Sequence, residues 1–288
     1  MREQGLNPAK KEDRQEFARW TYYDMVRDLT AFAKKYNPDF HVCYNKGHLG
    51  YLDKPVKEDY SYFSFESLPG IEWGYLDFPV SAKYMRNFGK ECLGLTSRFH
   101  TEWGDFHAFR NEAAMEYEVF SMLAHGCKCT IGDQMDYWGK LNTDMYKQIG
   151  RVYKSVEEKE PWCENAKPIS EIGVFTAEEF YATGVAGHIP GASEGVARLL
   201  MELGYQFDFI DSTLDFDKYR LLILPDVIPV DEELRDKLSI YLKKGGKLLV
   251  SYQSGLDRVH QKFMIPELAV VYKLSLIHIS EPTRLGMI

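Results

Sequence analysis

The sequence predicts an α/β protein with two successive parallel sheets. Three observations support this prediction: short apolar runs alternate with segments of helical period, polar loops follow the apolar runs, and Pro161, Trp162 and Pro168 mark a break between two sets of units. Such alternation is typical of parallel βα units. We place one domain at residues 1–163 and a second at residues 168–270.

A long helix opens the first domain. Asn7 followed by Pro8 is a helix-start signal, because Asn caps the first turn and Pro fits the first helical position. Asn37-Pro38 ends the helix. Between them, apolar side chains recur in steps of three and four residues, which predicts one inward face. The residues of this face are Phe17, Thr21, Met25, Leu29, Phe32 and Tyr36.

Strands and helices then alternate through the rest of the first domain. The predicted strands lie at 40–44, 62–65, 92–96 and 127–131, and the predicted helices at 79–88, 111–125 and 143–159. Gly89 and Gly126 close the first two of these helices. A closed barrel of parallel strands needs eight strands, and only four are visible. Either an upstream half is missing, or the sheet is open and doubly wound.

The second domain repeats the alternation. Its predicted strands are 172–175, 207–210, 221–224 and 247–251, and its predicted helices are 193–203 and 231–244. This order predicts a flavodoxin-like or class I amidotransferase-like sheet. Amidotransferase chemistry needs a Cys nucleophile after a strand, but Tyr252-Gln253-Ser254-Gly255 follows the last strand and contains no Cys. We therefore interpret the domain as structural, serving contact between subunits of a homo-oligomer.

Charge and hydropathy exclude two classes of partner. The 288-residue chain has a formal net charge of −8, which argues against a nucleic-acid partner. No apolar run reaches about 18 residues, so we expect no membrane partner. The N-terminal stretch MREQGLNPAKKEDRQE has no apolar core of a signal peptide. We expect a cytoplasmic bacterial protein. The missing signal peptide does not bear on this expectation, because we expect the true N-terminus to lie upstream of Met1.

Cysteine and histidine spacing predicts neither a metal nor a cofactor. The five cysteines are an odd and low number, which favours reduced thiols over a disulfide framework. Cys127 and Cys129 lack zinc-binding spacing, and His48, His100 and His107 are not compactly spaced. No Gly-rich nucleotide-binding motif is present.

Several short motifs carry a resemblance to known enzymes. ESLP (66–69), RFHTEWGDF (98–106), TIGDQM (130–135) and EKEPWC (158–163) resemble the alpha-L-fucosidase-like glycosyl hydrolases of glycoside hydrolase family 151. YRLLILPD (219–226) and GGKLLVSYQSGLD (245–257) are similar to the trimerisation-type domain of family 42 beta-galactosidases. The resemblance implies strands five to eight of a (β/α)8 TIM-like barrel, an amidotransferase-like accessory domain and a carbohydrate substrate.

The resemblance also implies what this chain lacks. Related retaining fucosidases place an Asp nucleophile at the end of strand four, and residue 1 would lie in the helix after that strand. We therefore expect a fragment that is inactive by itself. Two alternatives stay open: a beta-galactosidase-like hydrolase, and a non-catalytic carbohydrate-binding or assembly protein.

Glu66 is the candidate general acid/base. Glycoside hydrolysis needs two carboxyl groups, one of which is kept protonated by its surroundings. Glu66 ends a predicted strand among Phe63, Phe65 and Trp73, where desolvation would raise its pKa. A structural carboxylate that bonds a neighbouring loop is the alternative.

The other candidates are substrate-binding residues at the predicted strand ends. Trp103 offers an apolar face to a sugar ring, while Arg98 and His100 can donate to hydroxyl groups. A salt bridge from Arg98 to Glu102 or Asp105 is the alternative for that loop. The remaining candidates for sugar hydroxyls are Asn45, His48 and Asp133, which turn or cap geometry would explain as well.

The last segment, residues 271–288, breaks the preceding pattern. LSLIHISEPTR resembles translated sequencing-adapter DNA, so we interpret the segment as a non-native tail. An ordinary C-terminal strand at IHIS is the alternative.

Overall fold

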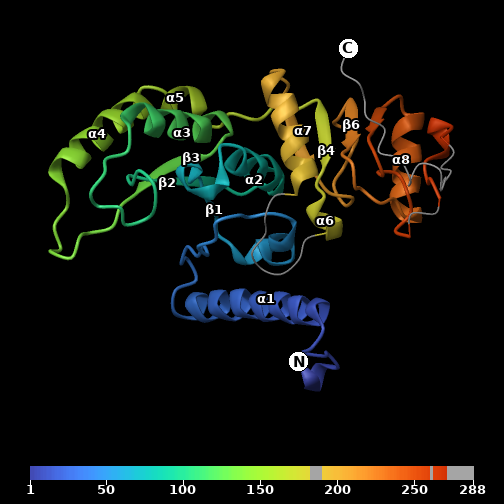
Figure 1. Cartoon of the computed structure of the whole chain (residues 1–288), viewed down its shortest axis with the longest axis horizontal. Helices are drawn as coiled ribbons and strands as arrows, with labels where there is room; N and C mark the ends of the chain where they lie inside the picture. The colour runs from blue at the N-terminus through green and yellow to red at the C-terminus, as the bar shows by residue number, and fades with distance from the viewer. Residues whose placement is uncertain (182–189, 260–261, 271–288) are drawn as a thin grey trace, which may run out of the picture.

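The computed structural model describes residues 1–181, 190–259 and 262–270, and the predicted tail lies outside this range. It is a mixed α/β structure with two parallel sheets (Figure 1). The first sheet has the order β1 (Phe63–Glu66), β2 (Cys92–Ser97), β3 (Lys128–Gly132). The second has the order β5 (Phe207–Ile210), β4 (Ile172–Phe175), β6 (Leu221–Leu224), β7 (Lys247–Val250).

Five of the helices that connect the strands lie where the periodicity predicted them: α2 (Asp77–Met85), α3 (Glu112–Ala124), α4 (Thr143–Glu157), α7 (Gly191–Glu202) and α8 (Glu232–Lys243). Two short helices were not predicted: α5 (Glu160–Cys163) and α6 (Glu178–Tyr181). Side-chain caps fix three starts: the side chains of Asn111, Asn142 and Asp231 accept backbone N–H bonds in the first turns of α3, α4 and α8. Gly126 and Gly204 follow α3 and α7 with φ of +77° and +73°, a conformation that favours glycine.

The predicted strand at 40–44 does not form. The backbone N–H of Ser61 donates to Val42 O at 2.8 Å, but the N–H of Val42 donates to the Ser61 hydroxyl and not to the main chain. A ladder needs successive backbone pairs. The segment therefore runs beside the start of β1 as an irregular chain, and the first sheet has three strands among the described residues.

The helix α1 (Lys11–Tyr36) forms, but its predicted inward face is wrong. Val26 and Thr30 are its buried residues, because α1 packs on the segment Tyr51–Asp59 and lies apart from the strands (Figure 1). Leu29 and Phe32 of the predicted face are 50% and 61% exposed. An amphipathic pattern shows that a helix has an apolar side, but not what covers it.

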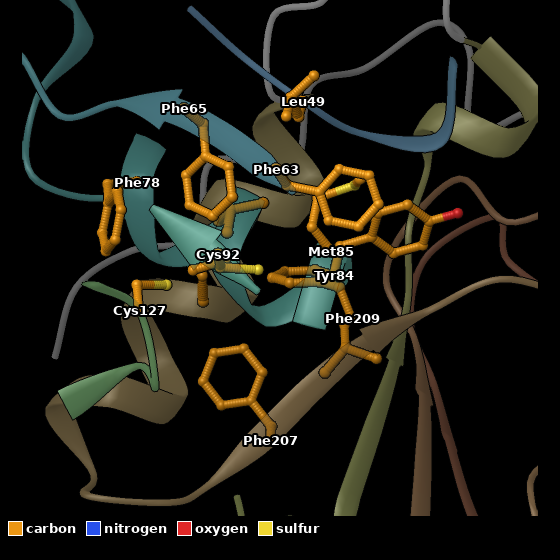
Figure 2. Close-up of a cluster of buried hydrophobic side chains, with 14 of the residues drawn as sticks. Leu49, Phe63, Phe65, Phe78, Tyr84, Met85, Cys92, Cys127, Phe207 and Phe209 are labelled. Atoms are coloured by element: carbon orange, nitrogen blue, oxygen red, sulfur yellow. The ribbon is translucent and has the colours of Figure 1, made fainter. Parts of the chain in front are cut away.

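One hydrophobic core spans both parts of the chain. The helix α2 lies between the sheets, so that Phe63 and Phe65 of β1 and Phe207 and Phe209 of β5 enter the same cluster around it (Figure 2). All four rings are fully buried. Burying such a side chain contributes about 1.5–3 kcal/mol. This shared core holds the second sheet against the first.

Charged pairs reinforce the contact between the two parts. Arg86, which follows α2 directly, donates through Nε and Nη2 to Oδ1 of Asp208 in β5, at 2.9 and 2.6 Å. Lys54 lies 2.7 Å from Asp211, which also accepts from the hydroxyl of Tyr84. These contacts offset the desolvation of Asp208 and Asp211, and the pKa of each lies below its usual value even though burial raises it.

Candidate functional site

The carboxyl ends of β1, β2 and β3 lie along one edge of the first sheet. Glu66 is level with Leu95 of β2, and Ser97 is level with Gly132 of β3. Because the strands are parallel, the loops that follow them meet at this edge. The structure thus brings Glu66 to the edge at which Arg98 and Asp133 follow β2 and β3.

Glu66 is a partly buried carboxyl group without a polar partner. Its neighbours Phe65 and Ser67 are buried, and within the described ranges no hydrogen bond or ion pair reaches its side chain. Desolvation therefore raises the pKa of Glu66 above its usual 4.5. A carboxyl group with a raised pKa at a strand end can donate a proton to a substrate oxygen.

Two loops wall the edge beside Glu66. The backbone N–H of Glu66 donates to Gly47 O at 3.2 Å. A Cβ at Gly47 would lie 2.4 Å from the indole of Trp73, so this ring packs directly on the 45–51 loop. A Cβ at Gly70 would similarly lie 2.9 Å from His100 O. The segments after β1 and β2 therefore contact each other above the sheet edge.

Arg98 pairs with Asp133 and not with Glu102 or Asp105. Its Nε donates to Oδ1 of Asp133 at 2.6 Å, and their side chains are only 4% and 8% exposed. The alternative salt bridge within the loop does not form, because the loop folds back over β3 and Asp133 meets the guanidinium there. Asp133 thus holds Arg98 in place and is not available to Glu66 as a separate charge partner.

Trp103 presents an exposed ring at the same edge. It is 47% exposed, and its ring packs edge-on against Phe99 with centroids 5.1 Å apart. A Cβ at Gly132 would lie 2.9 Å from the indole, so the absence of a side chain at the end of β3 lets the ring lie over it. An indole fixed on one side and open on the other can stack on a sugar ring.

A buried network beneath this loop was not predicted. Arg110 forms an ion pair with Glu118 of α3, and Thr96 of β2 donates to the other oxygen of the same carboxylate. Burial raises the pKa of Glu118 to about 7, against the lowering effect of Thr96 and Arg110. The N–H of Arg110 donates to Arg98 O, which closes the 98–110 loop at its base. No local spacing marks these contacts, so sequence reasoning missed them.

His48 is buried, and both of its ring nitrogens contact other side chains of the protein. Its Nε2 is 2.5 Å from Glu178 Oε1, and its Nδ1 is 2.7 Å from Ser81 Oγ. The order Ser–His–Glu resembles a hydrolytic triad, but Ser81 is 1% exposed and cannot meet a substrate. Both ring nitrogens are engaged, so the structure gives His48 an internal role.

Asn45 and His100 are exposed at the site loops. Neither has a side-chain hydrogen bond within the described ranges, so both remain available to a ligand.

In the same ranges no group of three or more His, Cys, Asp or Glu side chains could hold a metal ion. The five cysteines are free thiols, as the sequence predicted.

A cavity of about 1090 Å³ lies elsewhere, at the amino-terminal ends of the strands of the second sheet. Its lining includes Ile172, Leu221 and Lys247, the first residues of β4, β6 and β7. Ligands of open α/β sheets bind at the carboxyl ends of strands. We therefore place the candidate site at the edge of the first sheet.

The described helices include none that is both long and apolar enough to cross a membrane.

Comparisons with known proteins show which proteins the chain is similar to. Residues 198–270 match the family described as Beta-galactosidase trimerisation domain. Alpha-L-fucosidase isoenzyme 2 from Paenibacillus thiaminolyticus is 34% identical, with a TM-score of 0.85 over 92% of this chain and 41% of its own. No curated protein sequence matches the chain.

Beta-galactosidases share the fold at lower identity. The enzyme from Halorubrum lacusprofundi has a TM-score of 0.65 at 14% identity, covering 88% of this chain and 43% of its own. The enzyme from Rahnella sp. R3 has a TM-score of 0.65 at 18% identity, covering 87% and 41%. This chain thus spans less than half the length of each relative. The resemblance in the sequence motifs is confirmed: the chain is similar to a glycoside hydrolase, an alpha-L-fucosidase, over nearly its whole length, and its C-terminal part matches the beta-galactosidase trimerisation domain.

Proposed function

We propose that this chain supplies the acid/base side of the active site of a retaining alpha-L-fucosidase-like glycosidase. One observation carries the proposal: Glu66 is a partly buried carboxyl group, without a polar partner among the described residues, at the strand edge that also presents Trp103. Its raised pKa suits a group that protonates the leaving oxygen and then deprotonates water.

The other edge residues would bind the sugar. In this proposal Trp103 stacks on the apolar face of the ring, and the exposed Asn45 and His100 bond to hydroxyl groups. Arg98, oriented by Asp133, supports the loop that carries Trp103. The nucleophilic carboxylate is proposed to come from the remainder of the fucosidase-like fold, since this chain spans 41% of that relative. The finer architecture would be the C-terminal half of a TIM-like barrel (1–163) followed by an amidotransferase-like domain (168–270) for subunit contact.

A hydrolysis assay tests the assignment. The 288-residue chain, and a protein that joins it to the remaining barrel, would be given 4-methylumbelliferyl alpha-L-fucoside and beta-D-galactoside. We expect fucoside hydrolysis by the longer protein alone, and its loss in Glu66→Gln. The matched control is Glu58→Gln, because Glu58 has an exposed carboxylate away from the edge. Fucoside hydrolysis that persists in Glu66→Gln would refute the role of Glu66.

The match to the Beta-galactosidase trimerisation domain favours a second candidate, a beta-galactosidase-like hydrolase. It would use the same edge and the same Glu66. The galactoside in the assay separates the two, since the preferred substrate identifies the sugar. Sugar binding that survives Glu66→Gln, without turnover in either protein, would instead indicate a carbohydrate-binding role.

A further inference from the structure

Glu178 joins the second part of the chain to a loop of the first part. Its Oε1 lies 2.5 Å from His48 Nε2, and its Oε2 accepts the backbone N–H of Tyr51 at 2.8 Å. Through Nδ1, His48 in turn contacts Ser81 of α2. Glu178, His48 and Ser81 are all buried, so this link is shielded from water.

The carboxylate is fitted closely against the loop. A Cβ at Gly50 would lie 2.0 Å from Glu178 Oε2 and 2.8 Å from His48 Nε2. Only a residue without a side chain leaves room for the carboxylate at that position. The backbone at 48–51 therefore depends on where α6 places Glu178.

The same loop reaches the candidate acid/base. Its Gly47 O accepts the backbone N–H of Glu66, and its Gly47 backbone supports the ring of Trp73. The loop is thus attached to Glu66 at one end and to Glu178 at the other. A displacement of 48–51 would be transmitted over a few residues to the strand end that carries Glu66.

A second carboxylate anchors the loop from within the first part. Asp53 accepts from Lys46 Nζ at 2.8 Å and from Gly50 N at 3.0 Å, and the hydroxyl of Tyr22 also donates to it. If Asp53 were sufficient, Glu178 would be dispensable for the loop. The Tyr51 N–H and the His48 ring have no contact with Asp53 of this kind, so their positions rest on Glu178.

We propose that Glu178 is a positioning residue of the candidate site: acting through His48 and Tyr51, it fixes the 45–51 loop beside Glu66. The C-terminal part would then set the geometry of the acid/base edge in addition to making subunit contacts. The acid/base role of Glu66 rests on the proposed function, whereas the link from Glu178 to the Glu66 amide does not.

Hydrogen exchange on the full 288-residue chain tests the link. We would compare Glu178→Ala and Glu178→Gln with Glu179→Gln, a matched control on the same helix whose carboxylate binds Ser212 within the second part. We expect the amides of Tyr51 and Glu66 to exchange about tenfold faster in Glu178→Ala. Glu178→Gln, whose amide oxygen still accepts from Tyr51, should show a smaller increase. In the Glu178 variants, the amides of β4 should exchange at the wild-type rate. In Glu179→Gln, the amides of Tyr51 and Glu66 should also exchange at the wild-type rate.

Two results would overturn the proposal. One is unchanged exchange at Tyr51 and Glu66 in Glu178→Ala, which would mean that Asp53 alone holds the loop. The other is a uniform increase through both sheets, which would mean a general loss of stability. If Glu178→Ala does not fold, His48→Gln removes the His48 half of the link and should speed exchange of the Glu66 amide, while the Tyr51 amide keeps its bond to Glu178 and changes less.

L-fucose affinity of the same variants supplies a functional readout. If the wild type binds L-fucose, Glu178→Ala should weaken binding about tenfold, or about 1.4 kcal/mol, and Glu179→Gln should not. Equal affinity in Glu178→Ala and wild type would count against positioning. If the wild type binds no L-fucose, this chain alone does not form the sugar site, while the exchange of the Glu66 amide still decides the link and the hydrolysis assay on the longer protein still decides the proposed function.

Discussion

Arg98 and Asp133, which follow adjacent strands, form a nearly buried ion pair with Nε and Oδ1 2.6 Å apart. The pair ties the loop after β2 to the end of β3. Arg98 also lies over the rings of Phe99 and Phe106, whose centroids are 4.4 and 5.3 Å from its guanidinium carbon. The loop that carries Trp103 therefore has an electrostatic and an aromatic anchor.

Breaking this pair from one side is expected to be costly. Asp133→Ala leaves the buried guanidinium without its partner and should lower the free energy of unfolding by about 3–5 kcal/mol. Removing both charges should cost less than the two single changes together, since no charge is left uncompensated. Urea unfolding of the single and double variants measures the coupling. The control is Arg151→Ala, whose exposed pair with Glu112 should contribute nothing measurable; an equal loss in both would contradict the role of burial.

The pair His48 and Glu178 predicts a stability window in pH. Burial alone lowers the pKa of His48, but the charge and hydrogen bond of Glu178 outweigh it, so the pKa lies above the usual 6.5. For Glu178 burial raises the pKa, yet His48 and the Tyr51 N–H hold it below 4.5. The contribution of His48 is complete below pH 6.5 and is lost as pH rises through its raised pKa. That of Glu178 is complete above pH 4.5 and is lost as pH falls.

The measurement compares wild type with Glu178→Gln across pH 4–9. The variant should lose about 1.5–3 kcal/mol of unfolding free energy, most of it between about pH 4.5 and 6.5. Asp53 and Asp77 also face His48, and Lys46 faces Glu178, so some pH dependence should remain in the variant. His107→Gln, at an exposed histidine, is the control. A difference that grows toward pH 9 would contradict the assigned protonation states.

Local patterns predicted most elements well, because helices show apolar residues at helical spacing and buried parallel strands show short apolar runs. The strand at 92–96 appears as Cys92–Ser97, and the helix at 231–244 as Glu232–Lys243. The predictions that failed are those that depend on tertiary packing. The pattern of α1 identified an apolar side but not its covering. Residues 40–44 have strand composition, but Val42 makes only one backbone bond to Ser61 and no ladder forms.

The same limit applies to the candidate site. That Glu66 would end a strand followed from the alternation of elements, and so did its place at the edge with Arg98 and Asp133. The partners of these side chains did not follow: Asp133 is 35 residues from Arg98, and Glu178 is 130 residues from His48. Such pairings depend on how strands and helices pack, which no local repeat encodes. His48 was therefore assigned to a sugar when it serves the contact with α6.

Glu66 should reduce stability at neutral pH. Desolvation raises its pKa, so its charged form is disfavoured in the folded protein, and its stability contribution is lost as pH rises through the raised pKa. Glu66→Gln is expected to raise the melting temperature slightly at pH 7 and to leave it unchanged near pH 4. Glu58→Gln should lower the melting temperature at pH 7, because the bond to Lys57 lowers the pKa of Glu58. Thermal unfolding at both pH values checks the opposite signs, and a lower melting temperature for Glu66→Gln at pH 7 would show a favourable partner for its charge.

The outward face of α1 predicts an unusual contrast between two apolar residues of the same helix. Val26 is fully buried and Phe32 is 61% exposed. Val26→Ala removes two buried carbons and should cost about 1.5 kcal/mol of unfolding free energy, since each contributes about 0.8 kcal/mol. Phe32→Ser should change it by less than about 0.5 kcal/mol. Urea unfolding at two protein concentrations measures both. A larger loss for Phe32→Ser that grows with concentration would mean that a second molecule covers this face in solution, because only an intermolecular contact makes the cost depend on concentration.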